Sequence, residues 1–123
     1  RSESDDRIYV LRHDGVSGWA DLGSPGGTET GEWPSVVVDA SGVPYVAYTV
    51  TSGPMMHQLM VSKYVSGTGA GAVWEDLGHR SPNRGSHARM VMDATRDAPV
   101  LLYSDSVYGE TSLDLRVSRF KRY

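Results

Sequence analysis

A hairpin-like stretch that occurs twice in the chain constrains the fold more than any other feature. Residues 34–48 read PSVVVDASGVPYVAY, and residues 88–103 read ARMVMDATRDAPVLLY. Each copy is an apolar run that ends in Asp, a short polar turn that leads to a Pro, and a second apolar run that ends in Tyr. β-Branched and aromatic residues on both sides of a turn are typical of two paired strands. The sequence therefore predicts two copies of one β-hairpin.

The segments around each hairpin repeat as well. WADLG, which starts at Trp19, precedes the first hairpin, and WEDLG, which starts at Trp74, precedes the second. Alternating runs with one pattern follow the hairpins and also open the chain: LMVSKY at residues 59–64, LRVSRF at 115–120 and IYVLRH at 8–13. The copies recur about every 50 to 55 residues, a period typical of propellers and other arrays.

Four short strand-like runs per repeat, without a stretch of helical periodicity, predict an all-β fold of β-propeller blades, each with four antiparallel strands. The inner strands would be the apolar runs at 34–39, 44–50, 88–93 and 99–105. We expect about two blades: residues 1–7 as a flexible lead-in, 8–23 as the outer strands of a blade, 34–78 as a complete blade, and 88–120 as three strands of a further blade. Because such a short stack leaves apolar sheet faces open, we expect oligomerisation or the rest of a longer protein to complete the ring.

Composition and charge exclude several classes of protein. Apolar residues make up 39% of the chain and charged residues 22%, which are values of a globular domain. A formal net charge of −3, without a long basic run, argues against nucleic acid as a partner. The chain has no cysteine and no apolar stretch long enough for a membrane span. Because it starts without Met and stops shortly after an expected strand, we expect a piece of a longer protein or a mature or engineered fragment.

The motifs resemble a known group of repeats. The order W-x-x-L-G, apolar-x-apolar-Asp-x-x-Gly-x-Pro-Tyr-Val-Ala-Tyr and Val-x-Lys-Tyr is similar to tandem β-propeller repeats of bacterial and algal surface or secreted proteins, and residues 8–120 carry it. Arg96 and Asp97 depart from the pattern in the second copy. The resemblance implies a propeller and favours an extracellular or cell-surface location. Asp14 also lies five positions before Trp19, a spacing similar to the Asp-box of sialidase-type propellers, which would be a fold-stabilising turn.

The repeated polar and aromatic residues have structural and functional interpretations. Repetition at a strand start favours packing between blades over sugar binding for Trp19 and Trp74. Asp39 and Asp93 could be paired carboxylates, but their position before a turn favours capping of turn N–H groups. Tyr48 and Tyr103 are expected in the core or between blades, with their hydroxyl groups at the edge.

The connecting loops differ most between the two copies, and loops on a rigid frame commonly carry function. In a propeller, the loops on one face line the mouth of the central channel. The candidate ligand-binding residues in these loops are Glu32, Trp33, His57, Arg80, Arg84 and His87. Trp33 is the most notable, since a lone loop Trp needs a packing partner or a ligand. The histidines match no metal-ligand spacing, so solvated loop histidines are favoured, and we expect no metal and no cofactor.

These observations favour a non-catalytic interaction or scaffold module of a surface, secreted or structural assembly that recognises protein or glycan through its loop face. A lectin-like, carbohydrate-binding propeller is the alternative. A fragment of a sialidase-like glycoside hydrolase would need an arginine cluster from several blades and a Tyr–Glu pair, whereas Arg80 and Arg84 share one loop. We therefore expect no enzyme; the partners would be other copies of the chain or the remaining blades, and a protein or glycan ligand.

Overall fold

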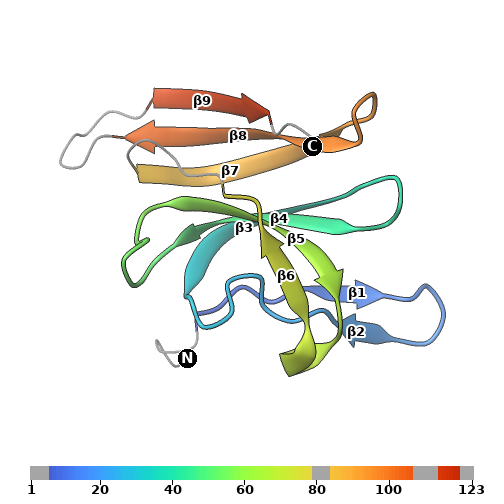
Figure 1. The fold of residues 1–123 in the computed structure, drawn as a ribbon. Coiled ribbons are helices and arrows are strands. Elements are labelled where there is room, and N and C mark those ends of the chain that lie inside the picture. The colour runs from blue at the N-terminus through green and yellow to red at the C-terminus, as the bar shows by residue number, and fades with distance from the viewer. Residues whose placement is uncertain (1–5, 79–83, 107–113, 120–123) are drawn as a thin grey trace.

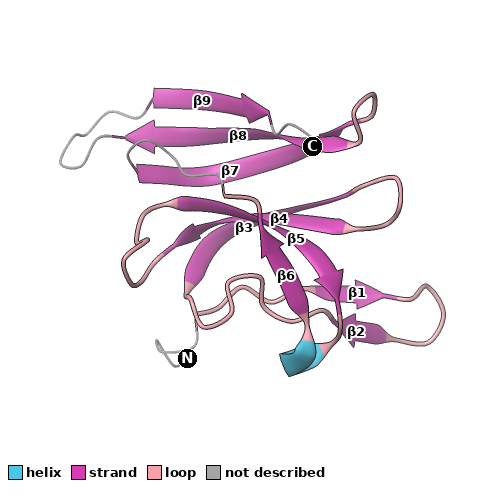
Figure 2. Ribbon diagram, in the orientation of Figure 1, coloured by secondary structure: helices cyan, strands magenta, loops and turns pink. Residues whose placement is uncertain are grey.

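The structure is a computed structural model that describes residues 6–78, 84–106 and 114–119. The described part of the chain is all-β apart from one short 3-10 turn, Gly69–Gly71 (Figure 2). The strands are β1 (Leu11–His13), β2 (Trp19–Asp21), β3 (Gly31–Val38), β4 (Pro44–Val50), β5 (Leu59–Ser66), β6 (Val73–Asp76), β7 (Arg84–Asp93), β8 (Ala98–Ser106) and β9 (Asp114–Arg119). Within the described ranges, no helix has the length and apolar character that a membrane span requires.

The strands form three antiparallel sheets in which sequence neighbours pair (Figure 1). β1 and β2 make a two-stranded sheet, β3-β4-β5-β6 a four-stranded sheet, and β7-β8-β9 a three-stranded sheet. All pairings are antiparallel. The prediction of an all-β fold with antiparallel strands is therefore confirmed.

The two hairpins pair in the same register. In the four-stranded sheet, Val46 lies opposite Val36 on β3 and opposite Ser62 on β5. Leu101, its equivalent in the three-stranded sheet, lies opposite Met90 on β7 and opposite Ser118 on β9. The sequence repeat is thus also a repeat of backbone pairing.

The Trp-led segments are equivalent too. Trp19 lies opposite His13 and packs against it edge to face, with ring centroids 5.1 Å apart. Trp74 lies opposite Tyr64 in the same way, at 5.4 Å. Each Trp therefore has a ring partner across its own hairpin.

The four-stranded sheet packs against another layer on each face, most completely around β4. Between it and the three-stranded sheet lies one apolar cluster: Tyr45, Ala47, Leu59, Val61, Ala88, Met90, Leu101 and Tyr103. Val46, Tyr48, Val50 and Met60 form a second cluster on its other face, where Ile8 and Val10 of the N-terminal segment pack. Every residue of β4 is buried, as a continuous apolar strand between two layers should be.

Three strands start three or more residues away from their expected positions. β3 starts at Gly31 and β7 at Arg84, not at residues 34 and 88, because each strand continues through a bulge. β1 proper starts at Leu11, although the Val10 N–H donates to the Gly23 carbonyl and extends the ladder. The Asp6 carbonyl accepts a hydrogen bond from the Gly31 N–H, so the described end of the expected lead-in is anchored; residues 1–5 lie outside the described residues.

Candidate functional site

A matched pair of bulges brings the two hairpins to one site. The pairing register shifts between Glu32 and Ser35 on β3 and between Ser86 and Arg89 on β7. Within these bulges, Trp33 has φ 54° and His87 has φ 55°. Residues other than glycine rarely adopt positive φ, because their Cβ atom then crowds the backbone. The same unusual backbone geometry therefore recurs at equivalent positions of adjacent sheets.

Trp33 and His87 stack on each other across the two sheets. Their ring centroids are 4.0 Å apart, and the ring planes differ by 24°. The indole retains an exposed fraction of 40%, so the stack covers only part of it. The ring partner of Trp33 is therefore the equivalent residue of the other repeat.

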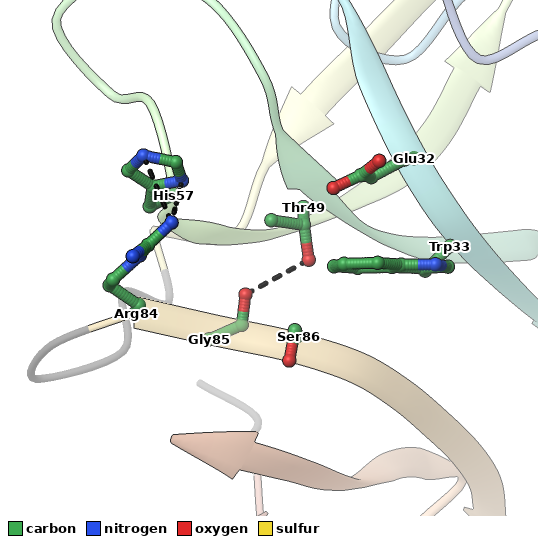
Figure 3. A pocket seen from close by; sticks show the side chains of 7 residues that line it. All are labelled: Glu32, Trp33, Thr49, His57, Arg84, Gly85 and Ser86. Carbon is green, nitrogen blue, oxygen red and sulfur yellow. Dashed lines mark hydrogen bonds between the residues drawn. The ribbon is translucent and has the colours of Figure 1, made fainter. Parts of the chain in front are cut away.

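Beside this stack, a cavity of about 170 Å³ lies between β3, β4 and β7 (Figure 3). Figure 3 shows Glu32 and Trp33 on one side of the cavity, His57 and Arg84 on the other, and Thr49 between them. The remaining lining residues are Gly85 and Ser86. The cavity thus combines one carboxylate, one guanidinium, hydroxyl groups and one indole, a set suited to a small polar ligand with an apolar face.

Hydrogen bonds fix the floor of the cavity. The Thr49 hydroxyl donates to the Gly85 carbonyl at 3.0 Å, and the Gly85 N–H donates to the His57 carbonyl at 3.0 Å. Arg84 Nη2 lies 3.2 Å from Nδ1 and 3.3 Å from Nε2 of His57. These contacts join β4, the β4–β5 connection and β7, so the cavity wall is held by both sheets.

Five of the six candidate ligand-binding residues meet here. Glu32, Trp33, His57 and Arg84 line the cavity, and His87 stacks on Trp33. The sixth, Arg80, lies outside the described residues. Two expectations about their setting were wrong. Glu32, Trp33, Arg84 and His87 lie in strands and not in loops. His57 lies in the β4–β5 connection as expected, but it is half-buried against Arg84 and not fully solvated.

Thr49, Gly85 and Ser86 were missed as lining residues. Thr49 is a hydroxyl-bearing residue in the otherwise apolar run PYVAYTV, which was a usable signal. Gly85 and Ser86 carried none, because their role depends on how β7 lies against β4.

The repeated aspartates bind turn N–H groups. Asp39 Oδ1 accepts from the N–H groups of Ser41 and Val43, both at 2.9 Å. Asp93 Oδ1 accepts from the Thr95 N–H at 3.0 Å, and its Oδ2 accepts from the Arg96 guanidinium at 2.8 Å. The Arg96 contact holds the pKa of Asp93 below its ordinary value. Both carboxylates therefore cap their turns, which is the role that the sequence favours.

The tryptophans differ in burial. Trp74 is half-buried against the second apolar cluster, and its indole N–H donates to the Leu22 carbonyl at 2.7 Å, which joins the four-stranded and two-stranded sheets. Trp19 is 69% exposed, so the expected packing between sheets does not occur for it within this chain. The physical reason is that, among the described sheets, only the four-stranded sheet packs against the two-stranded sheet, whose far face has no described layer.

Tyr48 and Tyr103 are buried as expected. The Tyr48 hydroxyl donates to the Glu29 carboxylate at 3.3 Å, and burial, with the Glu29 charge, raises the pKa of Tyr48. Both rings belong to the apolar clusters between adjacent sheets, and neither lines the cavity.

Among the described residues, no group of three or more His, Cys, Asp or Glu side chains is placed to hold a metal ion. In comparisons with known proteins, no family model matches the chain, and no curated protein or solved structure matches it either. The function is therefore argued from the geometry.

Proposed function

We propose that the chain is a non-catalytic recognition module of a surface, secreted or structural assembly, built from propeller-type blades, and that the cavity between β3, β4 and β7 binds a glycan unit. One observation carries this proposal. The two repeats agree in strand register and bulge geometry, yet the equivalent residues at the cavity differ: Glu32 corresponds to Ser86 and Trp33 to His87. Packing alone would not require this difference, whereas an asymmetric ligand site would.

The stacking of the sheets supports the propeller-type arrangement. Leu59 and Val61 of β5 face the three-stranded sheet. Ile8 and Val10, which occupy the same positions of the repeated run, face the four-stranded sheet. Successive sheets thus stack in the same sense, as blades around an axis do. The described residues form an open stack, and the closed ring is part of the proposal.

The cavity chemistry favours a sugar ring. The exposed part of the Trp33 indole offers an apolar platform, and Glu32 and Arg84 offer an acceptor and donors for hydroxyl groups. A volume of about 170 Å³ is smaller than the roughly 300 Å³ at which drug-sized pockets begin. A single ring therefore suits the cavity better than an extended ligand.

The same lining argues against glycoside hydrolysis. Most glycoside hydrolases use two carboxyl groups about 5–10 Å apart. Among the residues that line the cavity, Glu32 is the one carboxylate. Arg89, the third arginine near this segment, is exposed and donates to the Ala88 carbonyl outside the cavity.

A glycan array with the wild-type chain, followed by calorimetry with the best-bound glycan, tests the proposal. Trp33→Ala and Arg84→Ala should each weaken binding at least about tenfold, which corresponds to about 1.4 kcal/mol. Arg89→Ala is the matched control, since Arg89 lies on the same strand but outside the cavity, and it should bind like the wild type.

Two results would contradict the proposal. An array without a bound glycan would reject the glycan assignment, and binding that Trp33→Ala leaves unchanged would place the site elsewhere. Hydrolysis of a fluorogenic sialoside would overturn the non-catalytic assignment; we expect none.

A further inference from the structure

A second surface lies on the opposite face of the four-stranded sheet. An apolar groove of about 230 Å³ runs beside β1 and β3, lined by Ile8, Tyr9, Val10, Leu11, Pro34, Val36 and Val46. β1 is the edge of a two-stranded sheet, next to the four-stranded sheet (Figure 1). The Val10 carbonyl and N–H bond to Leu22 and Gly23, so the main chain of Leu11, one residue on, faces the open side of this edge. The groove is therefore apolar and borders an open strand edge.

The internal repeat indicates what fits there. Val36 on β3 and Met90 on β7 are equivalent, since Val36 lies opposite Val46 and Met90 opposite Leu101. Met90 is 6% exposed, because residues of β3 to β5 cover it, whereas Val36 is 58% exposed. The groove thus lacks the hairpin that covers the equivalent surface on β7 and β8.

The three-stranded sheet offers a hairpin with a matching face. Val91 is 63% exposed and Leu102 is 38% exposed. The equivalent residues of the four-stranded sheet are Val37 and Ala47. They belong to or pack on the apolar cluster through which that sheet contacts β7 and β8. The chain therefore carries both an uncovered apolar groove and an uncovered face of the kind that fills it.

The strand edges match as well. β9 pairs with β8 in the register in which β5 pairs with β4, so Val100 lies opposite Arg119 as Tyr45 lies opposite Lys63. Residues 8–13 carry the same alternating pattern as 59–64 and 115–120. Arg12 is the equivalent of Lys63 and Arg119, so β1 suits the position beside β8 that β9 occupies.

We propose that β1 of one copy pairs with β8 of a second copy and displaces the second copy's own β9. The strands β7 and β8 of the second copy and β1 and β2 of the first copy then form one four-stranded sheet. In this exchange β1 takes the place of β9, a strand with the same residue pattern, and the joined sheet covers Val36, Val91 and Leu102. It joins copies head to tail, which produces a ring when the rotation closes. The pairing does not depend on what the ligand cavity binds.

The exposed Trp19 is part of this interface. Trp74 donates its indole N–H to the Leu22 carbonyl of the next sheet. In the joined sheet, Trp19 takes the equivalent position against the Leu77 carbonyl of the second copy. Trp19, which contacts no neighbouring described sheet within one chain, thus gains such a contact from a second copy.

Disulfide trapping tests the pairing, because the chain has no natural cysteine. In the proposed register, Arg12 of one copy lies opposite Val100 of the other at a non-hydrogen-bonded position, where Cα atoms are about 4.5 Å apart and a disulfide fits. Within one chain, these residues lie in sheets on opposite faces of the four-stranded sheet. The Arg12→Cys, Val100→Cys double variant should therefore form interchain disulfides on oxidation, visible as multimers in non-reducing gels.

Two controls make the result specific. The single-cysteine variants and the out-of-register pair Arg12→Cys, Ser104→Cys should form several-fold fewer interchain disulfides. In sedimentation, Val91→Asp should shift the wild-type oligomer to a folded monomer, while Val65→Asp, at an exposed position outside this surface, should not. A wild-type monomer at every concentration, or an in-register pair that cross-links no more than the controls, would overturn the proposal.

Discussion

Trp33 and His87 occupy the same position of two successive repeats and stack face to face at 4.0 Å. Both have positive φ, which most side chains avoid. Strained backbone of this kind persists where the surrounding structure holds it, and it gathers at functional sites. The stack is therefore both the contact that aligns two adjacent strands and one wall of the proposed ligand site.

The stack should contribute a measurable coupling energy. In a double-mutant cycle of Trp33→Ala and His87→Ala, monitored by urea unfolding, we expect a coupling of about 0.5–1.5 kcal/mol, the range for aromatic pairs. Alanine at both positions leaves the backbone strain nearly unchanged, so the cycle isolates the ring contact. A coupling near zero would show that the rings lie together without stabilising the fold.

The positive φ of His87 predicts an inverted order of two small substitutions. His87→Gly and His87→Ala remove the same ring, but glycine adopts φ near 55° without a Cβ clash. His87→Gly should therefore be more stable than His87→Ala by about 1 kcal/mol, from the cost of left-handed backbone. At an ordinary strand position the glycine variant is less stable than the alanine variant. If urea unfolding finds His87→Gly less stable than His87→Ala, the result would contradict the bulge geometry.

Trp74 should matter more for the fold than Trp19. Trp74→Ala removes the packing on the second apolar cluster and the hydrogen bond to Leu22, and should lower the free energy of unfolding by about 3 kcal/mol. Trp19→Ala is the matched control in the equivalent hairpin. At concentrations where the chain is monomeric, its effect should stay within about 0.5 kcal/mol, as for other exposed sites. Equal losses in thermal or urea unfolding would contradict the difference in burial.

Much of the strand order followed from residue pattern, because apolar runs bounded by Gly, Asp and Pro specify strands and turns locally. The burial of β4 could be read from the run PYVAYTV. The bulges could not, since a bulky residue such as Trp33 rarely adopts positive φ and nothing in the local sequence marks where the pairing register shifts. The exposure of Trp19 was unpredictable for a related reason: it depends on which sheets are present to cover the hairpin, not on the hairpin's sequence.

The sequence indicated several of the residues that line the cavity, but it did not indicate that they share one cavity. Glu32, Trp33 and Arg84 stood out because they differ between otherwise similar repeats. Their common cavity depends on contacts between distant residues, such as the Thr49 hydroxyl and the Gly85 carbonyl, which are 36 positions apart. No local pattern encodes such a contact.

Substitution of Thr49 should therefore change both the stability of the fold and ligand binding in the cavity. Thr49→Val keeps the shape but leaves the Gly85 carbonyl without this donor, which should cost about 1–3 kcal/mol. Thr49→Ser keeps the hydroxyl and should recover most of that loss and most of the ligand binding. Urea unfolding measures the first effect and calorimetry the second; a Thr49→Val variant as stable as Thr49→Ser would show that the hydrogen bond contributes little.

The Asp14 turn provides a pH test. Asp14 Oδ1 accepts hydrogen bonds from the N–H groups of Val16 at 2.7 Å, Ser17 at 2.8 Å and Gly18 at 3.2 Å. These donors favour the charged form and lower the pKa of Asp14 from 3.8 to about 2. Because the pKa is lower in the folded state, the turn's contribution to stability is complete above about pH 4 and is lost as the pH falls towards 2.

NMR titration of the Asp14 side chain should therefore give a midpoint well below that of an ordinary aspartate. The amide shifts of Val16 and Ser17 should move with the same midpoint, because those N–H groups bind the carboxylate. Asp14→Asn, which keeps an acceptor oxygen but does not titrate, is the control and should abolish the transition. A midpoint near 3.8 would mean that the carboxylate does not cap this turn in solution.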